Sequence, residues 1–193
     1  MKYNLLLPIA GKAQRFLDGG YKMPKPLIMA KTKQVIDWAM ESFNTSQCNI
    51  TFAVRLEHIN NFSIDEILKK KFGKDVNIVV IDHDTDGSVS TCLLAKEYIN
   101  NDLPLIIYTP DVYFQDPFNP DNISEELDGL ILTFKANSPA HSYVALDKNG
   151  YATKTAEKQV ISSDAAVGVY YYKTGKMFVD YAEELVNKNI RTK

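Results

Sequence analysis

Short apolar stretches alternate with amphipathic ones along the first part of the chain. Apolar or β-branched runs, typical of strands buried on both faces, cover residues 5–9, 50–55, 76–81 and 104–108. Apolar positions with helical spacing occur between them at residues 35–43, 64–72 and 88–99. Ser88 is the predicted N-cap of the third helix. This alternation predicts an α/β fold with a parallel core and right-handed crossover connections.

After Asp111 the pattern changes to short strands joined by turns. The expected strands cover residues 130–135, 142–147, 151–158 and 166–173. The turn signal Asp-Lys-Asn-Gly at 147–150 predicts a hairpin, and apolar spacing at 177–186 predicts a final amphipathic helix. We therefore expect a mixed or antiparallel extension after residue 111. Since no repeat, low-complexity stretch or linker interrupts the pattern, residues 1–193 are expected to form a single domain.

A basic loop follows the first expected strand. It contains Gly11, which lets backbone N–H groups approach an anion, and four cations, Lys12, Arg15, Lys22 and Lys25. Pro24 and Pro26 fix φ on both sides of Lys25 and so set its direction. Ligands of open α/β sheets bind at the carboxyl ends of strands. The loop is thus either a phosphate site or a solvated basic turn.

Asp111 lies just past the fourth expected strand, at the same edge of the sheet as this loop. A carboxylate there could hold Mg²⁺ against nucleotide phosphates. The alternative is an ordinary turn residue after Pro110.

Composition limits the classes of partner. The net charge is −2, so the chain lacks the basic footprint of a nucleic-acid binder and any anion site must be local. The apolar start is too short for a membrane span and has no signal-peptide pattern. Cys48 and Cys92 have no metal-ligand spacing and are expected to be reduced thiols. We expect a cytoplasmic protein with no nucleic-acid or membrane partner.

Several motifs together resemble one enzyme family. The segment AGKAQRF…YKMPKPLI resembles the signature G-x-G-x-R-F…P-K-P-L of nucleotidyltransferases that make nucleotide sugars. DGSVSTCLLAKEYINNDLPLIIYTPDVYF resembles the family's glycine-led helix and metal-binding strand, and SYVALDKNGYATKTAEK and AAVGVYYY resemble its later substrate segments. The resemblance implies a Rossmann-like, glycosyltransferase-A-like fold, with a mostly parallel sheet flanked by helices.

The resemblance also implies roles for individual residues. Arg15 and Lys25 would be catalytic, and Asp111 would hold Mg²⁺. The nucleotide would contact Ala10, Gly11, Lys12, Ala13, Gly87 and Ser88. The second substrate would contact Tyr143, Glu157, Lys158 and Gly168. For three of these residues there are structural alternatives, namely a cross-strand ion pair of Glu157 and Lys158, and close contact of Gly168 with another backbone.

The chain departs from the family pattern in two places. Ala13 stands where the family has its second loop glycine, which would loosen the closest backbone approach to phosphate. The sequence ends at Lys193, before the segment in which relatives carry a second acidic metal ligand. We therefore expect the domain to lack the family's C-terminal segment.

The expected activity is Mg²⁺-dependent transfer of a nucleotidyl group from an NTP to a sugar 1-phosphate, for capsule or cell-surface polysaccharide biosynthesis. One alternative is a cytidylyltransferase that acts on a phosphorylated alcohol or amino compound such as phosphocholine. Another is a nucleotide-binding module without turnover. The tyrosines at 170–172 are compatible with a homo-oligomer interface, but a strand packed on both faces is the favoured interpretation.

Overall fold

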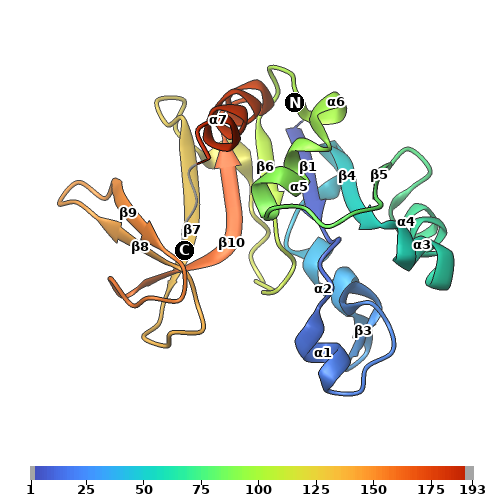
Figure 1. Ribbon diagram of the computed structural model, residues 1–193. Coiled ribbons are helices and arrows are strands. Elements are labelled where there is room, and N and C mark those ends of the chain that lie inside the picture. The colour runs from blue at the N-terminus through green and yellow to red at the C-terminus, as the bar shows by residue number, and fades with distance from the viewer. Residues whose placement is uncertain (1–2, 190–193) are drawn as a thin grey trace.

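The computed structural model describes residues 3–189 and is organised around one mixed sheet (Figure 1). Its parallel part has the order β5-β4-β1-β6. These strands are β1 (Tyr3–Pro8), β4 (Cys48–Arg55), β5 (Asn77–Ile81) and β6 (Leu105–Tyr108). The parallel core predicted from the apolar runs is therefore confirmed. The strand order reverses between β1 and β6, and such a switch point is where open α/β sheets bind ligands.

The antiparallel extension predicted after residue 111 is also confirmed. β10 (Asp164–Tyr172) runs antiparallel to β6. β7 (Gly129–Lys135) and β8 (Tyr143–Leu146) pair with β10, and β9 (Ala152–Ala156) pairs with β8. The turn at 147–150 closes the β8–β9 hairpin, where the Gly150 N–H donates to the Asp147 carbonyl at 3.1 Å. In Figure 1 this hairpin stands at the left, away from the parallel strands.

A bend at Gly168 allows β10 to pair with β6 of the parallel part and with β8 of the antiparallel extension. The pairing of β10 with β7 shifts register between Ala166 and Tyr170, and Gly168 within that shift has φ +92°. A Cβ at Gly168 would lie 2.2 Å from Thr109 Oγ1, so only glycine fits without rearrangement. Beyond the bend Tyr170 pairs with β6, whereas before it Ala165 pairs with β8.

Helices cover the sheet on both faces. One apolar cluster contains Leu5, Leu7 and Phe52, packed with α2 (Val35–Glu41), α3 (Leu56–Phe62) and α4 (Ile64–Phe72). The other contains Leu6 and Ile107, packed with α5 (Ser88–Leu93), α6 (Lys96–Ile99) and α7 (Gly175–Asn187). Successive residues of β1 point to opposite clusters, as the two-residue period of a strand requires.

The start of α7 packs closely against the chain after α6. The Thr174 hydroxyl caps the helix by accepting from the Met177 N–H at 3.0 Å. The Gly175 N–H donates to the Leu103 carbonyl at 2.8 Å. A Cβ at Gly175 would lie only 1.8 Å from the Ile99 carbonyl oxygen. Glycine at this position therefore lets two helix ends touch backbone to backbone.

The structure also differs from the sequence predictions. The helix expected at 88–99 is interrupted at Leu94–Ala95 into α5 and α6. The prediction of Ser88 as N-cap is wrong, because Gly87, with φ +141°, is the N-cap and Ser88 is the first residue of the helix. Unpredicted elements are α3, α1 (Gln14–Asp18), the hairpin of β2 (Met29–Ala30) and β3 (Lys33–Gln34), and the 3₁₀ helices η1 (Lys25–Leu27), η2 (Thr45–Gln47) and η3 (Pro120–Asn122).

Candidate active site

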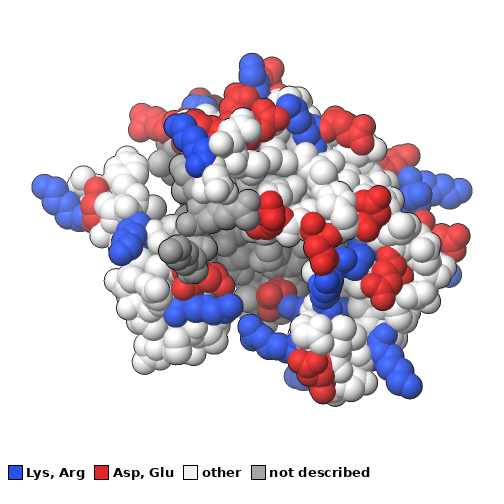
Figure 2. All heavy atoms as spheres, in the orientation of Figure 1, with Lys and Arg blue, Asp and Glu red and all other residues white. Residues whose placement is uncertain are grey.

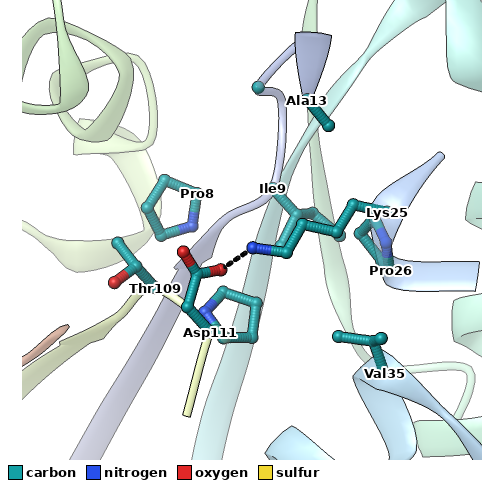
Figure 3. Close-up of a pocket in the computed structure, with 10 residues that line it drawn as sticks. Pro8, Ile9, Ala13, Lys25, Pro26, Val35, Thr109 and Asp111 are labelled. Atoms are coloured by element: carbon teal, nitrogen blue, oxygen red, sulfur yellow. Dashed lines mark hydrogen bonds and ion pairs between the residues drawn. The ribbon is translucent and has the colours of Figure 1, made fainter. Parts of the chain in front are cut away.

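A pocket of about 250 Å³ opens where the chain leaves β1 and β6. The residues that line it include Pro8, Gly11, Ala13, Lys25, Thr109 and Asp111. Sequence positions from the first loop and from the end of β6 thus share one cavity. Figure 3 shows the Lys25 side chain extending across this cavity to Asp111.

The first loop fixes the direction of Lys25. This residue begins η1, and it lies between the buried rings of Pro24 and Pro26. Its ammonium group forms an ion pair with the Asp111 carboxylate, and it lies 5.6 Å from the centre of the Phe16 ring. The Lys25 side chain is 27% exposed and that of Asp111 is 60% exposed. A partly sheltered cation is therefore held at the mouth of the pocket, within reach of an entering anion.

Short-range hydrogen bonds set the position of Asp111. Its N–H donates to the Thr109 carbonyl at 2.7 Å, and the Thr109 N–H donates to the Gly168 carbonyl at 2.9 Å. The Tyr108 hydroxyl donates to the Val112 carbonyl, and burial raises the pKa of Tyr108 to about 12, so the donor stays protonated at neutral pH. The carboxylate is thus presented on a turn anchored to β6 and β10.

Ala13 shows why a glycine pattern is natural in this loop. It is the N-cap of α1 with φ +50° and ψ 44°, a left-handed conformation that costs an L-residue roughly 1–2 kcal/mol. Its carbonyl accepts from the Phe16 N–H at 2.8 Å. The loop keeps this turn despite the alanine. Arg15, in the exposed α1, is not among the residues lining the pocket.

Lys12 and the buried Ala10 connect the first loop to two other segments. Lys12 pairs with Asp84 at 2.6 Å, and the Ala10 carbonyl accepts from Arg55 Nε at 3.0 Å. Hydrogen bonds from Lys12 and Arg55 hold the pKa of Asp84 below its usual range. Gly87 and Ser88 follow Asp84 at the start of α5, outside the lining of the pocket. Sequence reasoning missed Arg55 and Asp84; the acid-rich stretch before Gly87 was the available signal.

Two of the four residues expected to meet the second substrate line another pocket, of about 200 Å³. Tyr143 and Glu157 line it, together with Ala166 and Tyr170 of β10. The Tyr143 hydroxyl donates to the Ser138 carbonyl at 2.8 Å, and Glu157 accepts from the Ser142 hydroxyl.

Lys158 and Gly168 lie outside the lining of this second pocket. Lys158 pairs with Glu157 at 3.5 Å as its chain neighbour, beyond the end of β9, so the alternative of a cross-strand ion pair is wrong. Gly168 makes the close backbone approach that the structural alternative describes, to Thr109. Thr109 lines the first pocket, so this contact links the two sites through β10.

Asp111 is the residue that could hold a metal ion at this site. Within residues 3–189 no group of three or more His, Cys, Asp or Glu side chains is arranged to bind a metal by itself. Mg²⁺, however, is commonly bound through one or two carboxylates together with substrate phosphates and water. The exposed carboxylate of Asp111 at the pocket mouth fits a cation that enters with a phosphate.

His58 in α3 is a half-buried histidine next to the first loop. It lines a further pocket of about 300 Å³ with Lys12 and Arg55, and its Nδ1 is buried without a hydrogen-bond partner in the described part of the chain. Burial, and then the charge of Arg55, lower the pKa of His58. The folded protein therefore favours the neutral ring.

This shift predicts a pH-dependent stability. As pH falls below the unfolded-state pKa of about 6.5, the unfolded chain takes up a proton that folded His58 resists, so stability is lost. We expect the melting temperature of the wild type to fall between about pH 7.5 and about pH 5.5 more steeply than that of His58→Leu. Calorimetric scans of both proteins measure this, and parallel profiles would contradict the assignment to His58.

Charges of both signs are mixed on the face of the molecule that Figure 2 draws. Figure 2 shows Lys and Arg interspersed with Asp and Glu across the face drawn, around a hollow in its lower middle. None of the helices in residues 3–189 combines the length and apolar character that a membrane crossing requires.

Comparison with known proteins gives a clear result at the level of structure. No family model matches the chain, and no curated protein matches it in sequence. A nucleoside-diphosphate-sugar pyrophosphorylase from Vibrio cholerae RC9 superposes with a TM-score of 0.81 at 21% identity, over 97% of this chain and 82% of that one.

Two further solved structures are similar. A Bacillus anthracis protein described as a glucose-1-phosphate thymidylyltransferase, in complex with sucrose, superposes with a TM-score of 0.79 at 19% identity, over 99% of this chain and 79% of that one. A UDP-glucose pyrophosphorylase complexed with UDP-glucose superposes with a TM-score of 0.72 at 16% identity, over 95% of this chain and 80% of that one. The chain therefore has the Rossmann-like fold that these nucleotide-sugar pyrophosphorylases and thymidylyltransferases share.

Proposed function

We propose that the protein is a Mg²⁺-dependent nucleotidyltransferase that transfers NMP from an NTP to a sugar 1-phosphate and releases pyrophosphate. One observation carries this proposal. Lys25 and Asp111, 86 positions apart in sequence, meet at the switch point of the sheet in a single pocket. The fold, shared with proteins named as pyrophosphorylases and thymidylyltransferases, supports the same class of reaction.

The reaction needs no general base. The second pKa of a phosphate monoester is about 6, so the attacking oxygen is largely ionised at neutral pH. His58, His83 and His141 are not among the residues lining the first pocket. In the proposed step an acceptor phosphate oxygen attacks the α-phosphorus of the NTP in line, and the bond to the β-phosphate oxygen breaks. Catalysis then consists of alignment and stabilisation of charge.

Lys25 has the leading role in this mechanism. Its ammonium group would exchange the Asp111 carboxylate for an α-phosphate oxygen, since a triphosphate presents more negative charge than one carboxylate. Because two buried prolines flank Lys25, little reorganisation is needed when the ligand enters. Arg15 and Lys12 would contact the departing pyrophosphate from the exposed side of the loop.

The remaining residues would hold the substrates. Asp111 would bind Mg²⁺ jointly with phosphate oxygens, and that cation would neutralise charge on the triphosphate. The backbone of Gly11, Ala13 and Gly87 would contact the nucleotide. Tyr143, Glu157 and Lys158 would contact the acceptor. A nucleotide sugar made in this way in the cytoplasm would serve capsule or cell-surface polysaccharide synthesis.

Replacing Asp111 tests the metal role. Loss of an outer partner of a metal ligand already weakens metal binding about 10–100-fold, so Asp111→Asn is expected to raise the Mg²⁺ concentration for half-maximal rate at least about tenfold. The measurement is a Mg²⁺ titration of pyrophosphate release. Asp75→Asn, an exposed change after α4, is the control and should match the wild type. An unchanged Mg²⁺ dependence in Asp111→Asn would remove Asp111 from the site.

The function itself is tested by incubating the protein and Mg²⁺ with each NTP and a panel of phosphorylated acceptors, and measuring pyrophosphate. We expect release with one NTP and a sugar 1-phosphate, abolished by EDTA. Release only with CTP and phosphocholine or a similar compound would favour the cytidylyltransferase alternative. Mg²⁺-dependent NTP binding by calorimetry, without pyrophosphate release, would favour the binding module.

A further inference from the structure

Arg55 joins segments of the chain that are distant in sequence. It is the last residue of β4, and its side chain is only 15% exposed. Its Nε donates to the Ala10 carbonyl at 3.0 Å, and its Nη1 lies 3.1 Å from Asp84 Oδ1. One guanidinium thus holds the start of the first loop and the loop that follows β5.

The second partner of Asp84 is held differently. Lys12 pairs with the other carboxylate oxygen at 2.6 Å, but its side chain is 56% exposed and that of Asp84 is 63% exposed. Exposed ion pairs of this kind contribute little and exchange readily. Arg55 is sheltered and its guanidinium is rigid and planar, so that Nη1 is held toward Asp84 while Nε donates to the Ala10 carbonyl. Arg55 is therefore the fixed partner of Asp84, and Lys12 is the exchangeable one.

The loop from Asp84 to Gly87 is also fixed at its far end. The hydroxyls of Thr85 and Thr91 lie 2.6 Å apart, and the Thr91 hydroxyl donates to the Gly87 carbonyl at 3.1 Å. With Arg55 at one end and Thr91 at the other, the backbone of this loop has a set position relative to Ala10. Both segments belong to the nucleotide site of the proposed function.

We propose that Arg55 is a positioning residue that holds the Ala10–Ala13 and Asp84–Gly87 segments in place for nucleotide binding. Lys12 would then leave Asp84 for a phosphate oxygen, while Asp84 stays with Arg55. The part that concerns nucleotide rests on the proposed function. It predicts that Arg55 governs the KM for NTP, with little influence on the acceptor KM or on kcat.

Hydrogen exchange of the ligand-free protein tests the positioning role without reference to activity. In Arg55→Met we expect the amides of residues 10–13 and 82–87 to exchange about tenfold faster, as loss of a charged hydrogen bond implies. The matched control is Lys96→Met, which removes the exposed ion pair with Glu183 between α6 and α7 and should leave both segments unchanged. Equal exchange in Arg55→Met and wild type would overturn the proposal.

Kinetics with Mg²⁺ and the preferred NTP give the second readout. Arg55→Met should raise the KM for NTP about tenfold and change kcat by less than about threefold. Asp84→Asn, a change in an exposed side chain, should raise the KM for NTP about threefold, and it should cause no further increase in the Arg55→Met background. Additive effects, or a change confined to kcat, would overturn the proposal. A wild type inactive with every NTP would overturn the proposed function alone, since the exchange data still decide the role of Arg55.

Discussion

Lys25→Ala is expected to lower kcat/KM for nucleotidyl transfer about a hundredfold while leaving the protein folded. Lys25 is the cation that the prolines of the first loop hold at the pocket mouth, opposite Asp111. A preorganised charge acting on a developing phosphoryl transition state typically contributes about 3 kcal/mol, which is about a hundredfold in rate. Steady-state assays of pyrophosphate release measure the effect.

Stability data separate this loss from unfolding. Because Asp111 is largely exposed, breaking its ion pair with Lys25 should cost less than about 1 kcal/mol of unfolding free energy. The control is Lys74→Ala, an exposed lysine after α4, which should show the rate of the wild type. Normal turnover by purified, folded Lys25→Ala would show that Lys25 has no part in the reaction.

Gly175→Ala is expected to cause a large loss of stability. The added Cβ would lie 1.8 Å from the Ile99 carbonyl oxygen, which is backbone and cannot rotate away. The start of α7 must therefore move from the end of α6, and packing of Phe178 and Val179 in the second apolar cluster is disturbed. Overpacking costs about 1–3 kcal/mol when side chains can adjust, so we expect at least about 3 kcal/mol.

For a chain of this size, that loss corresponds to a melting temperature lower by roughly 6–12 °C. Chemical denaturation and calorimetry measure it. Gly11→Ala is the control for stability, because a Cβ at Gly11 meets no atom within 4 Å and its φ is not positive. If Gly175→Ala were as stable as Gly11→Ala, the close contact between α6 and α7 would not exist in solution.

The strands of the parallel sheet were predicted well because they are buried on both faces, and this burial is visible in the sequence as apolar runs. Leu5, Leu6 and Leu7 are fully buried between two helical layers, and such strands are necessarily apolar runs. Helix boundaries were less legible. α3 was missed because none of its residues is buried, so it lacks a clear apolar periodicity. It is separated from α4 by Ser63, whose positive φ of +49° could not be predicted from a serine in the sequence.

The part of the candidate site that depends on the order of the strands could be predicted from the sequence. The part that depends on side-chain contacts between loops could not. Lys25 and Asp111 were expected to meet because the ends of β1 and β6 adjoin at the switch point of a parallel sheet. The cluster of Arg55, Lys12 and Asp84 was not expected. Hydrogen bonds among polar residues of separate loops have no periodicity along the chain, so only the structure brings them together.

The position of β10 beside β6 has a consequence for how this architecture can diversify. Val169 of β10 is paired with Tyr108 of β6, so the chain leaves the parallel strands and returns to them at adjacent points. Everything between, including the walls of the second pocket around Tyr143 and Glu157, is one continuous excursion closed at its base by Thr109 and Gly168. Insertions in the turn of the β8–β9 hairpin would therefore change the surroundings of the second pocket while Lys25 and Asp111 keep their places, because that hairpin pairs with β10 and does not line the first pocket.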